Sequence, residues 1–470
     1  MVEGWLAAGS GCPGSLSPRD GRVLVWEEFR IAIEMRHYRL ARVIDGLAEM
    51  AQNAAKERKR MKQRVLSIKE IVPAFILAAA LLGATARASD WPNWRGPDHN
   101  GVSTETGWVS QWPADGPKTL WKASVGTGFS SITVAGGRAY TMGNQGDSDT
   151  VYCFEAATGK PVWKYSYACP VDPHYYEGGP SATPTIDQSR VFTLSKQGVV
   201  YCLDAEKGTV LWSKDAAREA GAATPTWGYA GSALAQGNLV IFNIGDSGAA
   251  LDKTSGNVVW TSGKGAAGYS TAVPCSFNGA AAVAILSAQG AFGVETKSGR
   301  QLWTYPFKTF SDMNIADLIV SGNEVFMSAA HEHGSALVRV QDGTAERVWE
   351  GTAMRNHINS SVLLDGYLYG VDGDAGGAAS LKCVELATGN EKWDYKGLGS
   401  GALMAADHKL IVISDKGELV VAQASPQGFN PISRAQVLGG KCWTVPTLAN
   451  GRIYCRNAKG DLVCLDAAGK

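Results

Sequence analysis

The sequence has no surplus of either charge. Its 44 Lys and Arg residues balance 44 Asp and Glu residues, so no net field would draw the protein to nucleic acid, an anionic membrane or an acidic substrate. It also lacks a Gly-x-Ser-x-Gly nucleophile elbow, a Walker phosphate loop and a His-Glu-x-x-His zinc motif. Nucleic-acid binding is therefore not expected, and hydrolase and nucleotide-dependent functions have no support.

A hydrophobic run long enough to span a bilayer comfortably is missing too. The apolar run at 71–83 is short, contains Pro73 and ends in small residues. Basic residues precede it from Lys62, and Ala86-Arg87-Ala88 follows it, as at a signal-peptidase site before Ser89. We predict a cleaved secretory signal over 61–88, an extracytoplasmic location, either periplasmic or secreted, and no stable membrane span after cleavage.

Residues 1–60 precede this signal, although secretory signals normally begin a chain. Two interpretations are open. Either translation of the natural product begins at Met61, or residues 1–60 are a cytoplasmic extension with a helix over 26–49. We favour the first.

Glycine, by contrast, is abundant, with 56 residues. Glycine supplies the positive φ angles that tight hairpins need, and many hairpins mean many short strands. The composition therefore predicts an all-β fold.

One segment recurs along the chain: an apolar strand, an acidic residue, and a turn whose glycine stands four residues before a tryptophan. From Trp163 to Trp393, successive tryptophans of the repeat are 43 to 49 residues apart, a spacing typical of a four-stranded propeller blade. We interpret the tryptophans as structural, filling the wedge between blades. The blade tryptophans are Trp121, Trp163, Trp212, Trp260, Trp303, Trp349 and Trp393, and the repeat near Val437 lacks one.

The two ends of the chain complement each other. The C-terminal segment from Cys464 to Lys470 is a repeat cut off before its tryptophan strand, and 119–122 is a tryptophan strand with no repeat before it. Joining them gives eight four-stranded blades and removes the exposed sheet edges of an open array. The sequence predicts an eight-bladed β-propeller closed by pairing its first strand with its last repeat.

Cysteines occupy apolar strand positions of the repeat. Cys153, Cys202 and Cys383 fall at the same place as Cys464, where a small buried hydrophobe belongs. Cys455 and Cys464 also flank one predicted hairpin turn, so a disulfide between them in an oxidising compartment stays an alternative.

The repeat resembles the alanine-x-aspartate-x-x-threonine-glycine-x-x-x-tryptophan motif of the pyrroloquinoline-quinone (PQQ) repeat family, over 119–470. Residues 89–118, which open with Asp90-Trp91-Pro92-Asn93-Trp94-Arg95-Gly96-Pro97, resemble the N-terminal strap of exported proteins with this repeat. Those relatives are similar both to quinoprotein alcohol dehydrogenases and to the propeller lipoprotein that assists outer-membrane barrel assembly. The resemblance thus implies either an enzyme or a scaffold.

Functional groups of a propeller come from equivalent loops around one mouth of its central channel. Polar and aromatic residues converge in the loops before the predicted innermost strands, the composition of a site for a planar ligand or a peptide. The alternative is that they satisfy the ends of the strands and plug the channel with water. The predicted ligand-binding residues are Phe129, Glu177, Trp227, Tyr269, Asn314, His357, Asn359 and Trp443.

A calcium-assisted quinoprotein needs oxygen ligands, a base and flat stacking surfaces. Here the resemblance would make Glu177 and Asn314 metal ligands and Asp312 the base. Many such enzymes, however, have adjacent cysteines beside the quinone and long insertions between blades. This chain has no two adjacent cysteines, and it also lacks the Cys-x-x-Cys-His motif that attaches a haem. PQQ and calcium are expected only under this alternative.

Two further clusters are interpreted as turns rather than metal sites. His331-Glu332-His333 precedes Gly334 at a predicted hairpin tip, and Asp372-Gly373-Asp374 lies where another hairpin turn is required. Our leading hypothesis is an exported, non-catalytic propeller that binds an extracytoplasmic protein or a small extended ligand. The alternative is a PQQ- and calcium-dependent dehydrogenase acting on alcohols.

Overall fold

The computed structural model describes residues 42, 46, 48–62 and 89–468. The chain divides into one unit within Met1–Gly83 and another within Ala84–Lys470. In the first unit, residues 48–62 are helical and exposed. The predicted signal and most of the predicted helix at 26–49 lie outside the described residues. No described helix is both long and apolar enough to cross a membrane.

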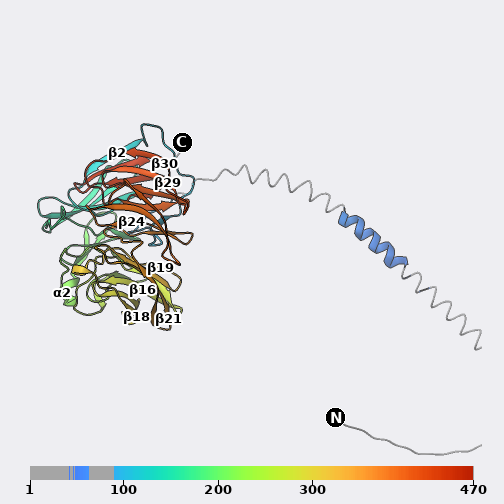
Figure 1. Cartoon of the computed structure of the whole chain (residues 1–470), viewed down its shortest axis with the longest axis horizontal. Helices are drawn as coiled ribbons and strands as arrows, with labels where there is room; N and C mark the ends of the chain where they lie inside the picture. The colour runs from blue at the N-terminus through green and yellow to red at the C-terminus, as the bar shows by residue number, and fades with distance from the viewer. Residues whose placement is uncertain (1–41, 43–45, 47, 63–88, 469–470) are drawn as a thin grey trace, which may run out of the picture. The chain divides into compact units, whose positions relative to one another are not determined.

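The second unit is a ring of eight antiparallel sheets (Figure 1), which we call blades 1 to 8 in chain order. Each blade runs from an innermost strand at the channel to an outermost strand at the surface. Blades 1 to 4 consist of β3 (Thr133–Ala135), β4 (Arg138–Asn144), β5 (Ser148–Glu155) and β6 (Pro161–Ala168); β7 (Thr185–Asp187), β8 (Arg190–Leu194), β9 (Val199–Asp204) and β10 (Val210–Asp215); β11 (Leu234–Gln236), β12 (Leu239–Phe242), β13 (Ala249–Asp252) and β14 (Val258–Thr261); and β15 (Val273–Phe277), β16 (Ala280–Ser287), β17 (Gly290–Glu295) and β18 (Gln301–Pro306).

Blades 5 to 8 continue this pattern, and the few helical residues of the unit lie in loops. The strands are β19 (Ile319–Ser321), β20 (Glu324–Ala329), β21 (Gly334–Gln341) and β22 (Thr344–Gly351); β23 (Val362–Leu364), β24 (Tyr367–Gly373), β25 (Ala379–Glu385) and β26 (Glu391–Lys396); β27 (Ala402–Ala406), β28 (Lys409–Ile413), β29 (Glu418–Gln423) and β30 (Asn430–Gln436), joined by β1 (Val102–Ser103); and β31 (Thr447–Ala449), β32 (Arg452–Arg456) and β33 (Asp461–Asp466), completed by β2 (Thr119–Ser124). The helices are α2 (Ala216–Ala220) and η1 (Phe310–Asp312).

Strand β2 closes the ring. It pairs antiparallel with β33, and Trp121 stands opposite Cys464 in the register. The outermost strand of blade 8 thus comes from the start of the propeller and its other three strands from the end of the chain. The prediction of an eight-bladed, four-stranded ring closed between its two ends is confirmed.

Each motif glycine makes room for the tryptophan of the preceding blade. A Cβ atom on Gly208 would lie 2.5 Å from the Trp163 ring, and Gly208 has a φ of 70°, which glycine adopts at little cost. The indole N–H of Trp163 then donates to the carbonyl of Ala205 in blade 2, at 3.0 Å. The same donation to the next blade is made by the indoles of Trp121, Trp212, Trp260, Trp349 and Trp393.

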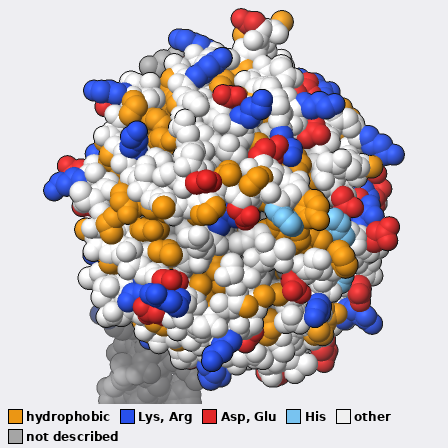
Figure 2. Space-filling model, turned by 90° about the vertical axis from the view of Figure 1, so that its left-hand side faces the viewer, with side chains coloured by type: hydrophobic (Ala, Val, Ile, Leu, Met, Phe, Trp, Pro, Cys, Tyr) orange, Lys and Arg blue, Asp and Glu red, His pale blue; other side chains and the backbone are white. Residues whose placement is uncertain are grey.

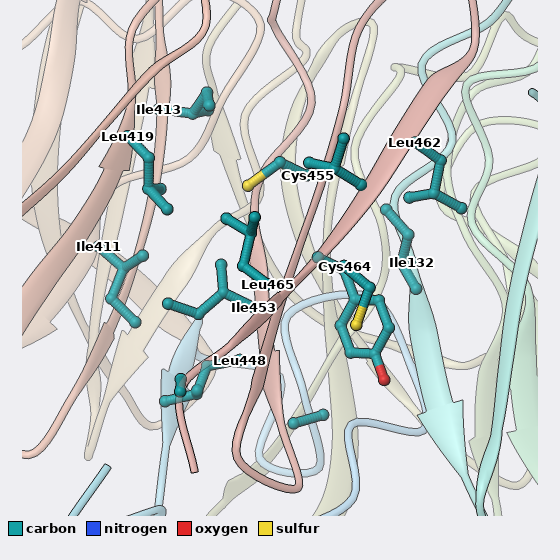
Figure 3. Packing of buried hydrophobic residues seen from close by; sticks show 14 of the residues in the cluster. Ile132, Ile411, Ile413, Leu419, Leu448, Ile453, Cys455, Leu462, Cys464 and Leu465 are labelled. Atoms are coloured by element: carbon teal, nitrogen blue, oxygen red, sulfur yellow. The ribbon is translucent and has the colours of Figure 1, made fainter. Parts of the chain in front are cut away.

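The core of blade 8 contains both cysteines of the possible disulfide. Cys455 stands opposite Val463, and Cys464 stands opposite Tyr454, in the β32–β33 ladder. Because paired residues share a face and faces alternate along a strand, the two thiols lie on opposite faces of the sheet. Figure 3 shows both among buried aliphatic side chains, with their sulfur atoms apart. The described cysteines are free, and the register excludes this bridge.

The strap, residues 89–118, crosses the channel. Trp91 forms an antiparallel bridge with Val134 of blade 1, and the Pro92 carbonyl accepts the N–H of Ile186 in blade 2 at 2.8 Å. Further along, β1 pairs parallel with β27 of blade 7. These contacts hold the strap against blades 1, 2 and 7, and the Trp94 indole N–H donates across the channel to Asp317, which precedes blade 5.

Candidate functional site

One mouth of the channel opens into a cavity of about 630 Å³. This volume lies within the usual range for small-molecule and side-chain pockets. Most of its walls come from the loops that enter the innermost strands, with His331 and Ala375 from other turns, and the strap contributes Trp94 to the lining. Figure 2 shows one face of the molecule, on which hydrophobic side chains gather near the middle with histidines among them.

A belt of hydrogen bonds links six blades, and four of its members line the cavity, namely Ser232, Thr271, Asp317 and Ser360. The belt residue of each blade lies two positions before its innermost strand, and its N–H donates to the side-chain oxygen of the next belt residue. These donations run from Ser131 to Thr183, to Ser232, to Thr271, to Asp317 and to Ser360, over 2.7 to 2.9 Å. The short polar side chains therefore fix the spacing of the inner strands around the cavity.

Asp317 is the acidic member of this belt, and it also anchors the strap. One carboxylate oxygen accepts the indole N–H of Trp94 at 2.6 Å, and the Arg95 Nε atom lies 3.8 Å from the same oxygen. Burial raises the pKa of Asp317 despite the attraction of Arg95. The strap and the ring thus meet at a buried ionic contact under the cavity.

Aromatic rings cover the walls nearest blade 8 and blades 1 to 4. Phe129 stacks on Trp443 with centroids 5.7 Å apart, and it contacts Tyr176 at 5.5 Å. Trp227 packs edge-on against Tyr269 at 5.8 Å. Burial raises the pKa of Tyr269 to about 12, so its hydroxyl stays protonated at neutral pH. These flat faces are suited to stacking with a ring or an apolar side chain.

Two aromatic side chains stand out into solvent at the entrance. Tyr175 is 91% exposed and Phe310 is 76% exposed, and both border the cavity. Tyr175 and Ser311 have φ angles of 66° and 52°, in the left-handed region that non-glycine residues seldom adopt. The loops thus hold apolar groups outward in a conformation that costs backbone energy.

Charged residues at the aromatic rim are paired. Lys441 forms an ion pair with Glu177 at 2.9 Å and lies over the Trp443 ring, 4.1 Å from its centroid. Lys196 pairs with Asp172 at 2.9 Å and lies 5.3 Å from the Tyr176 centroid. The aromatic wall therefore has no unbalanced charge from these lysines.

The rim at blades 5 and 6 carries a different set of groups. The Nε2 atoms of His331 and His357 lie 3.3 Å apart, and His331 Nδ1 lies 3.5 Å from a carboxylate oxygen of Asp374. Burial lowers the pKa of His357 to about 4, and the neighbouring His331 adds to this effect. His331 lies in a turn, as the sequence predicts. The predicted turn Asp372-Gly373-Asp374 begins later than expected, because Asp372 and Gly373 still belong to β24 and only Asp374 follows that strand. The fold nevertheless brings His331 and Asp374 together beside the cavity.

The structure gathers most of the predicted ligand-binding residues. Lining the cavity are Phe129, Trp227, Tyr269, His357, Asn359 and Trp443. Glu177 and Asn314 are not among its lining residues. Trp94, His174 and Asp317 line the cavity, although sequence reasoning did not select them. Asp317 could have been selected from the sequence, because it stands two residues before an innermost strand, where most other blades have Ser or Thr.

The proposed calcium ligands do not meet at this cavity. Asn314 is fully buried, and its amide donates to the carbonyls of Ser287 and Phe307 at 2.7 and 2.8 Å. The Glu177 carboxylate is engaged by Lys441. Asp312 follows Ser311 in η1, and its own φ is 56°. This arrangement does not fit a calcium ion held between Glu177 and Asn314.

Comparisons with known proteins agree with the propeller. A family model described as "Outer membrane protein assembly factor BamB" matches residues 105–173 and 171–395. No curated protein sequence matches the chain. Among solved structures, BamB from Moraxella catarrhalis is 18% identical, with a TM-score of 0.54, over 74% of this chain and 100% of that chain.

Two other solved structures extend the likeness to enzymes and designs. Quinohemoprotein alcohol dehydrogenase from Comamonas testosteroni is 11% identical with a TM-score of 0.58, over 83% of this chain and 82% of that chain. The computationally designed Ika8 protein is 13% identical with a TM-score of 0.52, over 74% and 99%. At these identities the likeness shows the fold alone.

Proposed function

The chain belongs to the PQQ-repeat family of outer membrane protein assembly factor BamB, and from that premise we propose that it is an exported binding propeller. In this proposal a partner protein inserts an extended segment with an apolar or aromatic side chain into the mouth cavity. The rest of the ring is a scaffold that holds the mouth loops in place.

The observation that carries this proposal is the aromatic cavity with two exposed aromatic side chains at its entrance. Phe129, Trp227 and Trp443 present ring surfaces inside it, while Tyr175 and Phe310 extend the apolar surface outward. Buried aromatic anchors of this kind dominate the binding energy of protein interfaces. Exposed large apolar groups around a hollow also mark sites of interaction.

The same proposal puts the propeller outside the cytoplasm. Its support is the basic, apolar and small-residue pattern at 61–88, which precedes the strap. A periplasmic or secreted propeller would present its mouth to other extracytoplasmic proteins.

The second candidate function is a PQQ-dependent alcohol dehydrogenase. The shared fold with a quinohemoprotein alcohol dehydrogenase and the stacking faces of Trp227 and Trp443 favour it. PQQ would supply the two-electron redox chemistry in such an enzyme. The ion pair of Glu177 with Lys441 and the position of the buried Asn314 outside the cavity lining weigh against it, so we derive no catalytic step.

The binding proposal is tested by selecting displayed random peptides on the full chain and measuring their affinity by fluorescence anisotropy. Trp227→Ala removes a wall of the cavity, and it should weaken the selected peptides by about thirtyfold or more, as expected for a hot-spot aromatic worth about 2 kcal/mol. Val259→Ala is the matched control. It removes an apolar side chain of blade 3, the blade that Trp227 precedes, but from the outermost strand β14, where Val259 is 48% exposed. This control should leave the affinity unchanged.

Peptides that bind both variants as tightly as the unmodified chain would contradict a mouth site. Calorimetry with PQQ and calcium, followed by dye reduction in the presence of alcohols, separates the two functions. Stoichiometric PQQ binding with turnover would replace the binding proposal with the dehydrogenase.

A further inference from the structure

Three metal-capable side chains meet at the rim of the cavity. His331 lies in the turn between β20 and β21, His357 in the loop between β22 and β23, and Asp374 in the turn between β24 and β25. One ligand atom from each lies within 4.8 Å of the other two. His331 and His357 also line the cavity, so the cluster is open to it on one side.

The spacing of the imidazoles suits a transition-metal ion. Their Nε2 atoms are 3.3 Å apart. Nitrogen ligands about 2.0–2.1 Å from a tetrahedral zinc ion lie about 3.3 Å from each other, so the rings need little movement to share an ion. Two imidazoles and one carboxylate are a common ligand set for zinc, cobalt and other divalent transition metals.

Asp374 keeps a charge available for a cation. One of its oxygens accepts the backbone N–H of His331 at 2.8 Å. The nearby Arg355 guanidinium donates instead to Asp372, at 3.0 and 2.8 Å, and Lys382 also lies 3.2 Å from Asp372. Because Asp372 pairs with both cations, they do not form an ion pair with Asp374.

The backbone at His331 is held in an uncommon conformation. His331 and Glu332 have φ angles of 53° and 61°, which cost energy for residues with a Cβ atom. Strained non-glycine backbone is concentrated at ligand sites, where the surrounding structure holds it. Here that conformation directs the His331 ring toward His357 and Asp374.

The cluster is joined by a chain of hydrogen bonds. The Ala375 N–H donates to His357 Nδ1 at 2.8 Å, so the ring proton of neutral His357 is on Nε2 and faces His331 Nε2. For His357 to bind an ion through Nε2, this proton would have to leave Nε2 for Nδ1, and the Ala375 N–H would have to turn away from Nδ1. Gly376 follows Ala375, and its N–H donates to Ser400 Oγ at 3.1 Å.

We propose that His331, His357 and Asp374 bind one divalent transition-metal ion, of the zinc or cobalt class, at the rim of the mouth cavity. Its remaining coordination positions face the cavity, where water or a ligand atom would occupy them. The proposal does not depend on peptide binding, and either can fail without the other.

The test is a titration of the full chain with Co²⁺, monitored by visible absorption, after removal of metals with a chelator. One equivalent should give the intense bands of four-coordinate cobalt, and Zn²⁺ should displace them. His331→Ala should weaken binding at least tenfold, because it removes a ligand. With Cu²⁺, electron paramagnetic resonance should show two imidazole nitrogens in the unmodified chain and one in this variant.

His333→Ala is the matched control, since it changes a histidine of the same turn. Its ring packs edge-on against Phe307 at 4.4 Å, so cobalt affinity should be unchanged. Asp374→Asn retains an oxygen for the His331 N–H but removes the charge, and it should weaken binding at least tenfold. Melting curves without metal should show that His331→Ala, an exposed turn variant, remains folded.

Absence of stoichiometric Co²⁺ binding would overturn the proposal. So would equal affinity for His331→Ala and the unmodified chain, or an equal loss for His333→Ala. A spectrum with thiolate charge-transfer bands would assign the ion to a cysteine and would also overturn it.

Discussion

Replacing Asp317 with Asn should detach the strap from the ring. The Asp317 carboxylate accepts the Thr271 N–H at 2.7 Å and the Trp94 indole N–H at 2.6 Å. An asparagine has one acceptor oxygen and one donor amide at these positions, so one of the two N–H groups would face another donor. The substitution also leaves Arg95 as a buried cation without its counter-charge.

The size of the loss follows from this burial. A buried ion pair contributes little net stability, because desolvation of both charges offsets their attraction, but removal of one partner typically costs about 3–5 kcal/mol. Burial lowers the pKa of Arg95, so desolvation of its guanidinium outweighs the attraction of Asp317. Arg95 keeps hydrogen bonds to the carbonyls of Asn100 and Ser361, so we expect about 3 kcal/mol for Asp317→Asn.

Urea unfolding followed by tryptophan fluorescence measures this loss, and limited proteolysis detects release of residues 89–118. The double variant Arg95→Met with Asp317→Asn should recover part of the stability, because it leaves no unpaired buried charge. A loss below about 1 kcal/mol for Asp317→Asn, or strictly additive effects in the double variant, would refute the buried anchor.

Three other predictions concern the ring and the strap. Gly208→Ala would place a Cβ 2.5 Å from the Trp163 ring and should cost about 2–4 kcal/mol in urea unfolding, whereas Gly237→Ala, with a similar φ of 59° but open space, should cost only about 1–2 kcal/mol. Deletion of residues 116–125 removes β2 and the buried Trp121 and should lower the melting temperature by at least about 5 °C; an unchanged value would contradict closure by β2. Burial lowers the pKa of His99 in the strap to about 4, below its unfolded value of about 6.5, so its contribution to stability is present above pH 6.5 and is lost as the pH falls toward 4. At pH 5 the free energy of unfolding should therefore be about 2 kcal/mol lower than at neutral pH. When the urea midpoint is measured against pH, His99→Gln should make its fall below pH 6.5 correspondingly shallower.

The fold was readable from the sequence because the repeat is periodic. In five repeats a glycine stands four residues before the tryptophan, and it marks one local event, the packing of an indole on the next blade, as for Trp163 on Gly208. The unfinished repeat at Cys464 and the unpaired strand at Trp121 could then be matched without any long-range information. The same reasoning did not distinguish the two faces of a strand at Cys455, which requires the register.

The site could be predicted from the sequence only for residues that occupy equivalent positions in successive repeats. Phe129 and Trp443 occupy equivalent loops, so their convergence on one cavity could be expected. Trp94 reaches Asp317 from the strap, 223 residues away in sequence, and no local pattern encodes that contact. His331 and Asp374 belong to turns of different blades, which look like ordinary hairpin tips until the ring brings them together.

The most direct measurement of the central claim is photo-crosslinking from the entrance of the cavity in cells that express the full chain. Benzoylphenylalanine would replace Tyr175 or Phe310 at the entrance, or Val259 on the outer strand β14, one position at a time. All three side chains are exposed. The binding proposal predicts that both entrance positions crosslink to the same extracytoplasmic protein and that the Val259 position does not. Crosslinks from the Val259 position alone, or none from either entrance position, would contradict it.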